Sequence, residues 1–473
     1  MSNLELDKKL SPADVAAYGA VEVSRRDTIA VGERAATQAN NVAPEVAAVP
    51  VLPITARPTF PLFGWDVALP PSLRALGHRN FRLFWSGQLI SLVGTWMQNI
   101  ARGWLVLELT HSPFWLGMVG FANAFPVLIF SLWGGLIADR VPKRTLIIVT
   151  QAISMVMAFV LAALTLTHTV EVWHIVAVSL VLGTVFAFDA PARQSFTVEM
   201  VEGKEDLMNA VALNSSIFNG ARVAGPAIGA IALAWQGPGM AFLLNGLSFL
   251  AVLAGLFLMK LPPHPKHAQN VGGKGKIIEG LNYVRRHSTI GVLMLLIATV
   301  SIFAFPYTVL MPIFADNVLG VGKEGYGMLM AFSGIGSLIG ALRLAVKSGH
   351  GEANRGRIIF FGAVSLPLVL AMFALSSNYL LSLATLLVVG WAMIAINATV
   401  NTIIQTNVPD ELRGRVNGVF ALLFIGMAPL GNLQAGIVAD HFGAPVAIFV
   451  GAVVTGLVVL YILLRHRHVF SMD

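Results

Sequence analysis

The sequence contains no cysteine among its 473 residues, and charged residues make up only 12% of it. The absence of cysteine excludes disulfides, thiolate metal sites and cysteine nucleophiles. A soluble domain carries about 25% charged residues. A chain with about half that share and 56% hydrophobic residues has too little polar surface to cover a soluble fold. Intrinsic disorder, a secreted disulfide scaffold and an ordinary soluble enzyme are therefore excluded.

Motifs for nucleotide-driven or metal-dependent chemistry are also missing. No phosphate-binding P-loop occurs, so ATP is not the expected driver. The eleven histidines include no HExxH motif and no ligand-like pair within an apolar run. We therefore expect no enzymatic activity, no cofactor, no metal and no nucleic-acid partner. The chain does not open on a signal-peptide pattern.

Apolar runs of about 20 residues, the length of a transmembrane helix, repeat from residue 81 onward. Short polar breaks separate them, so we predict an all-α integral membrane protein with twelve transmembrane helices. The predicted spans are 83–107, 114–137, 146–167, 173–190, 210–234, 239–259, 289–314, 325–345, 357–376, 379–402, 416–438 and 444–464. The fourth ends in a polar break, which indicates a bend.

The lysines and arginines lie almost entirely on one side of these spans. With the N-terminus placed inside, only Lys323 falls outside, Arg102 and Arg222 lie within spans away from the inner ends, and all the others lie in inside segments or at the inner ends of spans. Because cytoplasmic loops carry an excess of basic residues, we predict that both termini are cytoplasmic and that the protein lies in the inner (plasma) membrane.

A segment rich in proline, glycine and lysine divides the spans into two sets of six. The predicted domains are a disordered cytoplasmic tail (1–69), a six-helix bundle (70–259), a cytoplasmic linker (260–288), a second six-helix bundle (289–465) and a cytoplasmic C-terminus (466–473). A regulatory or partner-binding role is the alternative for the tail. The polar loops VEGKEDLMNAV (201–211) and VPDELRGRV (408–416) resemble each other. Such parallel repeats are typical of transporters built from two duplicated bundles.

The loop after the second span has the sequence GGLIADRVPKR, residues 134–144. It resembles the signature loop of the major facilitator superfamily. Further segments resemble the branch that includes the enterobactin exporter and related drug and siderophore efflux permeases: FRLFWSGQLISLVGTWMQ (81–98), WLVLELTHSP (104–113), DAPARQSF (189–196), ARVAGPAIGA (221–230) and VPDELRGRVNG (408–418).

This resemblance implies two pseudo-symmetric six-helix bundles that work as a secondary active efflux transporter. The expected mechanism is rocker-switch alternating access driven by proton antiport. The expected partners are a small amphipathic molecule (a siderophore or drug), protons and membrane lipids, and the protein is expected to be a monomer. A lysophospholipid flippase of the same superfamily and a nontransporting membrane receptor on this scaffold are the alternatives.

A polar stripe follows one face of the first span. Its members fall within an arc of about 100° on a helix that turns 100° per residue: Gln88, Ser91, Thr95, Gln98, Asn99 and Arg102. Polar residues facing lipid are costly, so this face is expected to look into the protein or into water. Asn397, Asn401 and Gln405 repeat the pattern in the tenth span, and Tyr307 lies on the seventh.

In the superfamily, the first, fourth, seventh and tenth helices line the central cavity. The resemblance therefore implies that these side chains form a substrate cavity. Hydrogen bonding between helices, without any ligand contact, is the alternative.

An inner gate is the second candidate site. Its residues are Gly135, Asp139, Arg140, Arg144 and Asp189. We predict that Asp139 faces the start of helix eleven near Val416, where unpaired N–H groups favour an anion, and that Arg140 pairs with Asp189. Such a latch would hold the outward-open state. The alternative is that the charged loop only sets the topology.

Two features of the spans have open roles. Gly225, Pro226 and Gly229 form either a hinge between the bundles or a simple close-packed contact. Arg222 is either a structural charge or a ligand for an anionic substrate, and Arg102 either binds such a substrate or reaches the outer surface. No acidic residue lies in the middle of a predicted span, so the sequence does not identify a proton-coupling carboxylate. Those near span ends are Glu108, Asp139, Asp189, Asp316 and Asp440.

Overall fold

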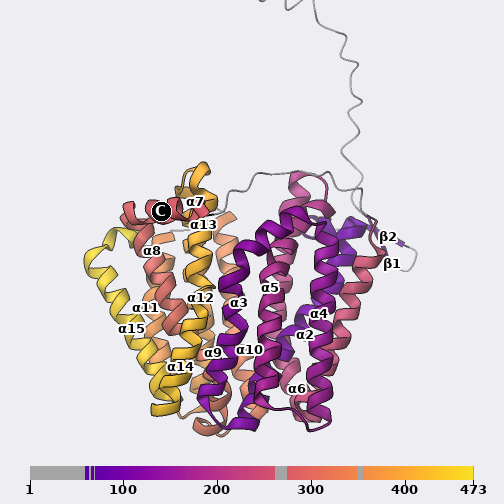
Figure 1. The fold of residues 1–473 in the computed structure, drawn as a ribbon. Coiled ribbons are helices and arrows are strands. Elements are labelled where there is room, and N and C mark those ends of the chain that lie inside the picture. The colour runs from indigo at the N-terminus through magenta and orange to yellow at the C-terminus, as the bar shows by residue number, and fades with distance from the viewer. Residues whose placement is uncertain (1–58, 63–64, 69, 261–273, 350–354, 472–473) are drawn as a thin grey trace, which may run out of the picture. The chain divides into compact units, whose positions relative to one another are not determined.

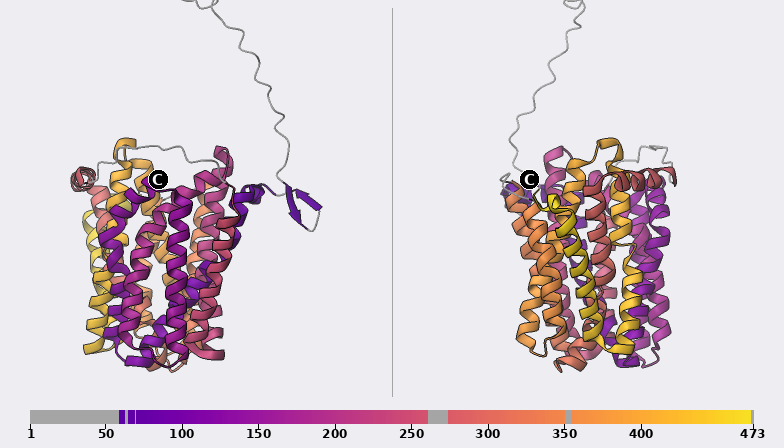
Figure 2. Two further views of the ribbon diagram at one scale, coloured as in Figure 1. Left: turned by 45° about the vertical axis from the view of Figure 1, so that its right-hand side comes forward. Right: turned by 90° about the vertical axis from the view of Figure 1, so that its left-hand side faces the viewer.

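The computed structural model describes residues 59–62, 65–68, 70–260, 274–349 and 355–471. Helices dominate these residues and run side by side (Figures 1 and 2). The elements in chain order are β1 (Thr59–Leu62), β2 (Trp65–Ala68), η1 (Pro71–Gly77), α2 (Arg79–Thr110), α3 (Pro113–Arg140), α4 (Lys143–Leu166), α5 (Val172–Met200), α6 (Lys204–Leu258), α7 (Lys274–Arg286), α8 (Ser288–Thr299), η2 (Val300–Ala304), α9 (Tyr307–Ile313), η3 (Phe314–Val318), α10 (Gly322–Gly349), α11 (Arg355–Ala374), α12 (Tyr379–Asn407), α13 (Asp410–Phe424), α14 (Ala428–Phe442), α15 (Ala444–Arg465) and η4 (Arg467–Ser471). We call α2–α6 the N-terminal half and α8–α15 the C-terminal half.

Ten helices in the described part of the chain are long and apolar enough to cross a membrane. One of them, Glu205–Leu258, has 54 residues, and its backbone leaves helical geometry at Gln236 and Gly237. α2 has 32 residues but is not among the ten, because its polar stripe lowers its hydropathy. Counting the long helix as two crossings and adding α2 gives the twelve predicted spans. That number stays a prediction.

Regular structure occurs within both the predicted tail and the predicted linker. β1 and β2 form an antiparallel hairpin within the predicted tail, with Thr59 opposite Ala68; residues 1–58 of that tail lie outside the described residues. In the predicted linker, residues 261–273 also lie outside them, and the amphipathic piece that follows is helix α7. Glu279 of α7 forms an ion pair with Arg415 of α13.

Two helices extend beyond their predicted spans, in both cases into polar sequence. α5 does not stop at the predicted residue 190 but continues through Pro191 to Met200. Helix eleven begins at Asp410, six residues before the predicted start, and is broken between α13 and α14 at residues 425–427. In both places, polar side chains find partners on neighbouring helices, so the helix continues into sequence that is no longer apolar.

Glycines allow the closest helix contacts in each half. A Cβ added to Gly336 of α10 would lie 1.8 Å from the carbonyl oxygen of Leu387, and one added to Gly390 of α12 would lie 1.9 Å from that of Ser333. The same reciprocal contact joins α3 and α5 in the other half, through Gly134 against Ala187 and Gly183 against Asn123. Small residues permit such backbone contact in membranes, and its recurrence supports the internal repeat.

Replacing Gly336 with alanine is expected to lower the free energy of unfolding by about 1–3 kcal/mol, because the new Cβ would overlap a backbone oxygen that cannot move freely. Thermal unfolding of purified protein in detergent measures the effect. Gly220→Ala is the matched control, since a Cβ there meets nothing within 4 Å. Equal midpoints for both variants would contradict the tight packing of α10 on α12.

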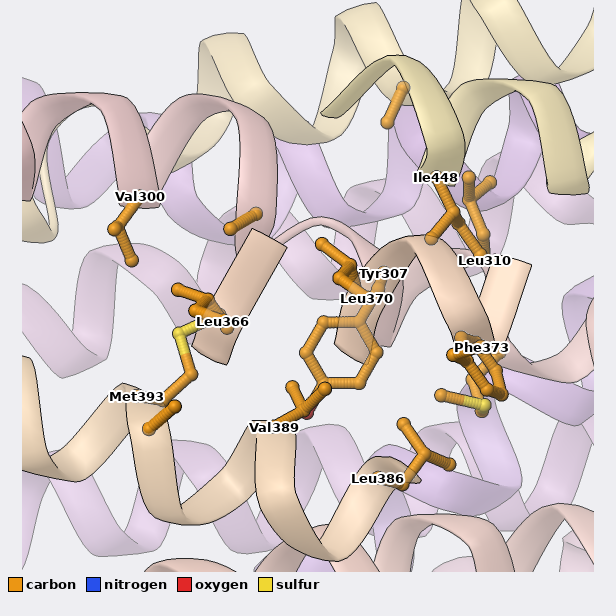
Figure 3. Close-up of a cluster of buried hydrophobic side chains, with 14 of the residues drawn as sticks. Val300, Tyr307, Leu310, Leu366, Leu370, Phe373, Leu386, Val389, Met393 and Ile448 are labelled. Atoms are coloured by element: carbon orange, nitrogen blue, oxygen red, sulfur yellow. The ribbon is translucent and has the colours of Figure 1, made fainter. Parts of the chain in front are cut away.

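The core of the C-terminal half lies among α9, α11, α12 and α15 (Figure 3). Its side chains include Val300, Tyr307, Leu310, Leu366, Leu370, Phe373, Leu386, Val389, Met393 and Ile448, all buried. Phe373 also stacks on Phe314, with ring centroids 4.3 Å apart. This packing gives the C-terminal half a closely packed apolar interior.

Candidate functional site

The two halves meet along two helix pairs, α3 with α14 and α6 with α10. We call the end of the helices predicted to face the cytoplasm the inner end, and the opposite end the outer end. Near the outer end, a Cβ added to Gly117 would lie 2.6 Å from the carbonyl oxygen of Asn432 and 2.7 Å from Cα of Gly436. Deeper in the pair, the Leu128 side chain lies against Gly426. The backbones of α3 and α14 therefore touch.

The second pair is packed in the same way over its outer part. A Cβ added to Gly327 of α10 would lie 2.3 Å from Cβ of Ala230 and 3.0 Å from the carbonyl oxygen of Pro226. Two turns further along α10, one added to Gly334 would lie 2.7 Å from the carbonyl oxygen of Arg222. No space for a side chain remains between these helices.

The inner parts of the same helices do not meet. A Cβ added to Gly135, Gly220, Gly414 or Gly418 would find nothing within 4 Å. Asp139 and Arg140 at the inner end of α3 are exposed. The halves are thus closed against each other from the outer end down to Leu128 and Arg222, and open beyond that level toward the inner end.

Arg222 lies at this boundary. Its guanidinium carbon is 5.9 Å from the ring centroid of Trp96, which itself packs edge-on against Phe218 at 6.2 Å. Tyr307 of the C-terminal half is near enough to interact with it electrostatically. Among the described residues, no carboxylate pairs with Arg222. An arginine within a membrane span costs about 2.5–3.5 kcal/mol on insertion scales, and the cation–π contact offsets only part of that cost.

Arg102 forms a second site, nearer the outer end. Its Nη2 donates to Oδ1 of Asn99 at 3.0 Å and its Nη1 donates to Oγ of Ser179 on α5 at 3.4 Å. The guanidinium therefore points inward and does not reach for the outer surface. Tyr326 of α10 covers this place: its ring stacks on Trp104 at 6.1 Å.

The two helix segments that carry these arginines both contact α10 of the opposite half. The Arg222 segment contacts α10 at Gly334, and the Arg102 segment contacts it at Tyr326. Eight residues of α helix separate these contacts, which is about 12 Å at 1.5 Å per residue. Guanidinium groups bind carboxylates and related anions through paired hydrogen bonds. Either guanidinium would therefore suit an anionic ligand.

The sequence of this chain matches a family model described as transmembrane secretion effector, over residues 71–472. That match covers well over half of the chain. The protein belongs to this family, within the major facilitator superfamily. It is a multi-pass membrane transporter and not an enzyme.

Its curated relatives are transporters of siderophores and drugs. The staphyloferrin A transporter of Staphylococcus aureus is 29% identical over 368 residues, covering 76% of this chain and 90% of that protein. The enterobactin exporter EntS of Escherichia coli K12 is 25% identical over 397 residues, covering 83% and 93%. The multidrug efflux pump Tap of Mycolicibacterium fortuitum is 27% identical over 368 residues, covering 74% and 87%.

Solved structures show the same fold at low identity. The nucleoside transporter NupG superposes with a TM-score of 0.62 at 15% identity, covering 86% of this chain and all 100% of that one. A POT family transporter in complex with 5-aminolevulinic acid gives a TM-score of 0.68 at 10% identity, covering 83% and 97%. The two-bundle major facilitator fold predicted from the sequence is therefore confirmed.

The polar stripe of α2 divides into two groups in this transporter. Gln88, Ser91 and Gln98 are buried, and Gln98 accepts a hydrogen bond from Asn245 of α6 at 2.7 Å. Bonding between helices thus accounts for Gln98. Thr95, Asn99 and Arg102 are only partly buried. These three are the members of the stripe that stay candidates for contact with substrate.

The cavity candidates of the C-terminal half also differ among themselves. Tyr307 is 2% exposed, and its hydroxyl group is 2.6 Å from Oγ of Ser333, so it belongs to the core of that half. Asn397 and Asn401 are partly buried on α12, and Nε2 of Gln405 donates to Oδ1 of Asn401 at 2.7 Å. The two asparagines stay candidates for the cavity.

The predicted inner latch is not assembled in this conformation. Asp189 does not pair with Arg140. It is 6% exposed, forms an ion pair with Arg193, and accepts hydrogen bonds from Thr150 at 2.6 Å and Gln151 at 3.2 Å. The intrahelical arginine, four residues along α5, is closer to Asp189 than any residue of the loop after α3.

Two further details of the inner gate prediction change. Val416 is a buried residue in the interior of α13, so it cannot offer free N–H groups; the first turn begins at Asp410. Arg144 donates to the carbonyl oxygens of Leu256 at 2.8 Å and Phe257 at 3.2 Å. It therefore binds the last carbonyls of α6 within its own half.

The glycine cluster of α6 makes close-packed contacts, and its role as a hinge stays a prediction. Gly225 and Gly229 pack on α2 in the same half, where a Cβ at Gly225 would lie 2.3 Å from that of Trp96. Pro226 instead contacts α10 of the other half. The backbone stays helical through Pro226, so the cluster is a contact and a seal without a break.

Sequence reasoning missed Arg193, Thr150 and Gln151 around Asp189. The spacing of Asp189 and Arg193, at i and i+4, was the available signal. One pocket of about 320 Å³ lies apart from all these residues, between α11 and α15, and its lining is almost wholly apolar, including Pro367, Phe449 and Gly456. It offers no polar group to orient a substrate, so it is not the substrate site.

Proposed function

We propose that this transporter exports a small, amphipathic, anionic molecule of siderophore or drug type from the cytoplasm by rocker-switch alternating access. The observation that carries the proposal is the contrast along α3, α6, α10 and α13–α14, which are closed at the outer end and open at the inner end. Arg222 lies where the closed part begins. A substrate entering from the inner end would meet its guanidinium and the ring of Trp96 first.

The relatives support the direction and the class of cargo. One is named an exporter of enterobactin and another a multidrug efflux pump, and both align with most of this chain. Two arginines within the spans, without a carboxylate partner among the described residues, favour an anion over a cation as the cargo. Export also requires the plasma membrane with the basic loops inside, which the lysine and arginine distribution favours.

The direct test is flux in proteoliposomes. The protein would be reconstituted into vesicles and supplied with a fluorescent catecholate or hydroxycarboxylate chelator on the side of its inner end. We expect movement of the chelator that saturates with concentration and accelerates when the opposite compartment is acidic. Equal rates in vesicles with and without protein would refute transport of this class, and rates independent of the pH gradient would refute proton antiport.

Proton antiport needs a carboxylate that can bind and release a proton. Glu108, Asp139, Asp316 and Asp440 are exposed near helix ends. Asp189 differs, because it is buried within α5 beside hydrogen-bond donors from α4. We therefore assign the coupling role to Asp189, whose ion pair with Arg193 would be exchanged for a proton during the cycle.

Arg222→Gln is expected to raise the KM for an anionic substrate about ten-fold, because a hydrogen bond to a charged group contributes about 1.5–3 kcal/mol. Concentration-dependent flux in the same vesicles measures it. Arg222→Lys keeps the positive charge and should restore most of the affinity. An unchanged KM in the glutamine variant would show that Arg222 is only a structural charge.

A further inference from the structure

Asp440, at the outer end of α14, bonds to the first turn of a helix in the opposite half. Its Oδ1 accepts a hydrogen bond from Oγ of Ser112 at 2.7 Å and a longer one from the backbone N–H of Phe114 at 3.4 Å. Ser112 is the N-cap of α3, and its own side chain does not cap the helix. At that helix start, the backbone N–H of Phe114 instead donates to a carboxylate from the C-terminal half.

The sequence around Asp440 repeats the signature loop. Residues 436–440 have the sequence GIVAD, and residues 135–139 have the sequence GLIAD. Glycine, alanine and aspartate are identical, and the two remaining positions exchange one branched aliphatic residue for another. Both pentapeptides lie at the C-terminal end of their helix, α14 in one case and α3 in the other.

α3 and α14 are antiparallel neighbours that cross at Gly117 and Gly436. α14 therefore brings its pentapeptide to the N-terminal end of α3. The pentapeptide of α3 lies toward the inner end, the end at which α13, the segment before α14, begins. A carboxylate at such an end interacts favourably with the helix dipole. The two antiparallel helices are related by an approximate two-fold axis parallel to the membrane plane, so one aspartate lies at the outer end and the other at the inner end.

We propose that Asp440, with Ser112 and the amide of Phe114, is an outer latch that holds the outer ends together. It is the inverted counterpart of the inner gate that contains Asp139, and it rests on the alternating access proposed above. In the present structure the outer latch is bonded, whereas Asp139 is exposed at an open inner end. Opening of the outer end must break the bonds of Asp440, and the same movement brings Asp139 toward α13.

At the outer end of the other helix pair, the described residues contain no second bonded aspartate of this kind. Its corresponding outer segment on α6 has Trp235 and Gln236 in place of an aspartate, and both are exposed. Within the described residues, no hydrogen bond joins Gln236 to α10. Loss of the latch between α3 and α14 should therefore change the distance between the outer ends measurably.

The experiment measures distances between the halves, and the absence of native cysteine makes paired labelling simple. Spin labels at Thr169→Cys and Ser377→Cys report on the outer ends, and labels at Glu202→Cys and Asn407→Cys report on the inner ends. All four positions are exposed loop residues or helix ends. Double electron–electron resonance in lipid nanodiscs gives the populations of short and long distances for each pair.

Asp440→Ala should increase the ratio of outer-open to inner-open protein about five-fold, because the loss of one N-cap interaction destabilises a helix start by about 1 kcal/mol. Ser112→Ala should shift it in the same direction by less, and Asp440→Asn should restore most of the wild-type ratio because an amide oxygen can still accept. Asp316→Ala, which removes another exposed acid of the outer end, is the matched control and should change nothing.

Distance distributions in Asp440→Ala and Ser112→Ala that match wild type would overturn the outer latch. So would an equal shift in the Asp316→Ala control, which would reduce the effect to general loss of negative charge. The flux assay on the same proteins tests the proposed function separately. A missing flux refutes efflux of the chosen substrate, whereas only the distances decide about the latch.

Discussion

A Gly117→Leu variant is expected to transport about a hundred-fold more slowly than wild type and to keep its outer ends apart. In the structure, even a Cβ at this position would lie 2.6 Å from the carbonyl oxygen of Asn432. A leucine cannot fit between two helix backbones in contact, so the outer-closed state is lost. The upper end of the cost of overpacking, about 3 kcal/mol, corresponds to a hundred-fold change in rate.

A leucine at the inner end is the control, because it should change the distances between the halves in the opposite direction. Gly418 of α13 has open space around it, so leucine there costs nothing in the present conformation. It would obstruct only the closure of the inner end. Gly418→Leu should therefore shorten the outer distance and lengthen the inner one, the reverse of Gly117→Leu. Two shifts in the same direction, or normal flux in Gly117→Leu, would contradict alternate closure of these helix pairs.

The fold could be predicted because the sequence features that indicate it are long and recur along the chain. Apolar runs of about 20 residues and the one-sided distribution of basic residues gave the spans and their order. The boundaries failed where polar residues continued a helix. Asp189 and Arg193 satisfy each other within α5, so the helix runs on to Met200, and a hydropathy pattern contains no information about such pairing.

The site was only partly predictable, because periodicity places a residue on a face but does not say what covers that face. The stripe of α2 lies between two different neighbours. Gln98 meets Asn245 of α6, whereas Arg102 meets Ser179 of α5. Both lie within one polar arc, and only the tertiary structure shows which neighbouring helix each side chain meets.

The inner latch was predicted for the outward-open state, so the present conformation, which is open at the inner end, does not test it. A sequence specifies all states of a transporter at once, and one conformation contains one set of contacts. Asp139 and its partner helix are apart while Asp440 and Ser112 are bonded. The repeated pentapeptide was present in the sequence, but its meaning depends on knowing that α3 and α14 are antiparallel neighbours.

Asp189→Asn is expected to abolish export driven by a proton gradient while leaving downhill substrate exchange in place. An amide cannot bind and release a proton near neutral pH, so the substrate cycle would lose its link to the gradient. Thr150 and Gln151 can still donate to the remaining oxygen, which preserves the local structure. Flux in proteoliposomes, measured with and without a pH gradient, distinguishes the two activities.

A structural effect of the unpaired arginine must be separated from the loss of the proton site. Removing one partner of a buried ion pair leaves a charge that costs about 3–5 kcal/mol when fully buried, although Arg193 retains 21% side-chain exposure and the cost is reduced accordingly. The double variant Asp189→Asn/Arg193→Gln removes that charge. If the carboxylate carries the proton, the double variant also lacks gradient-driven export; if gradient-driven export returns, the pair is structural and the coupling residue lies elsewhere.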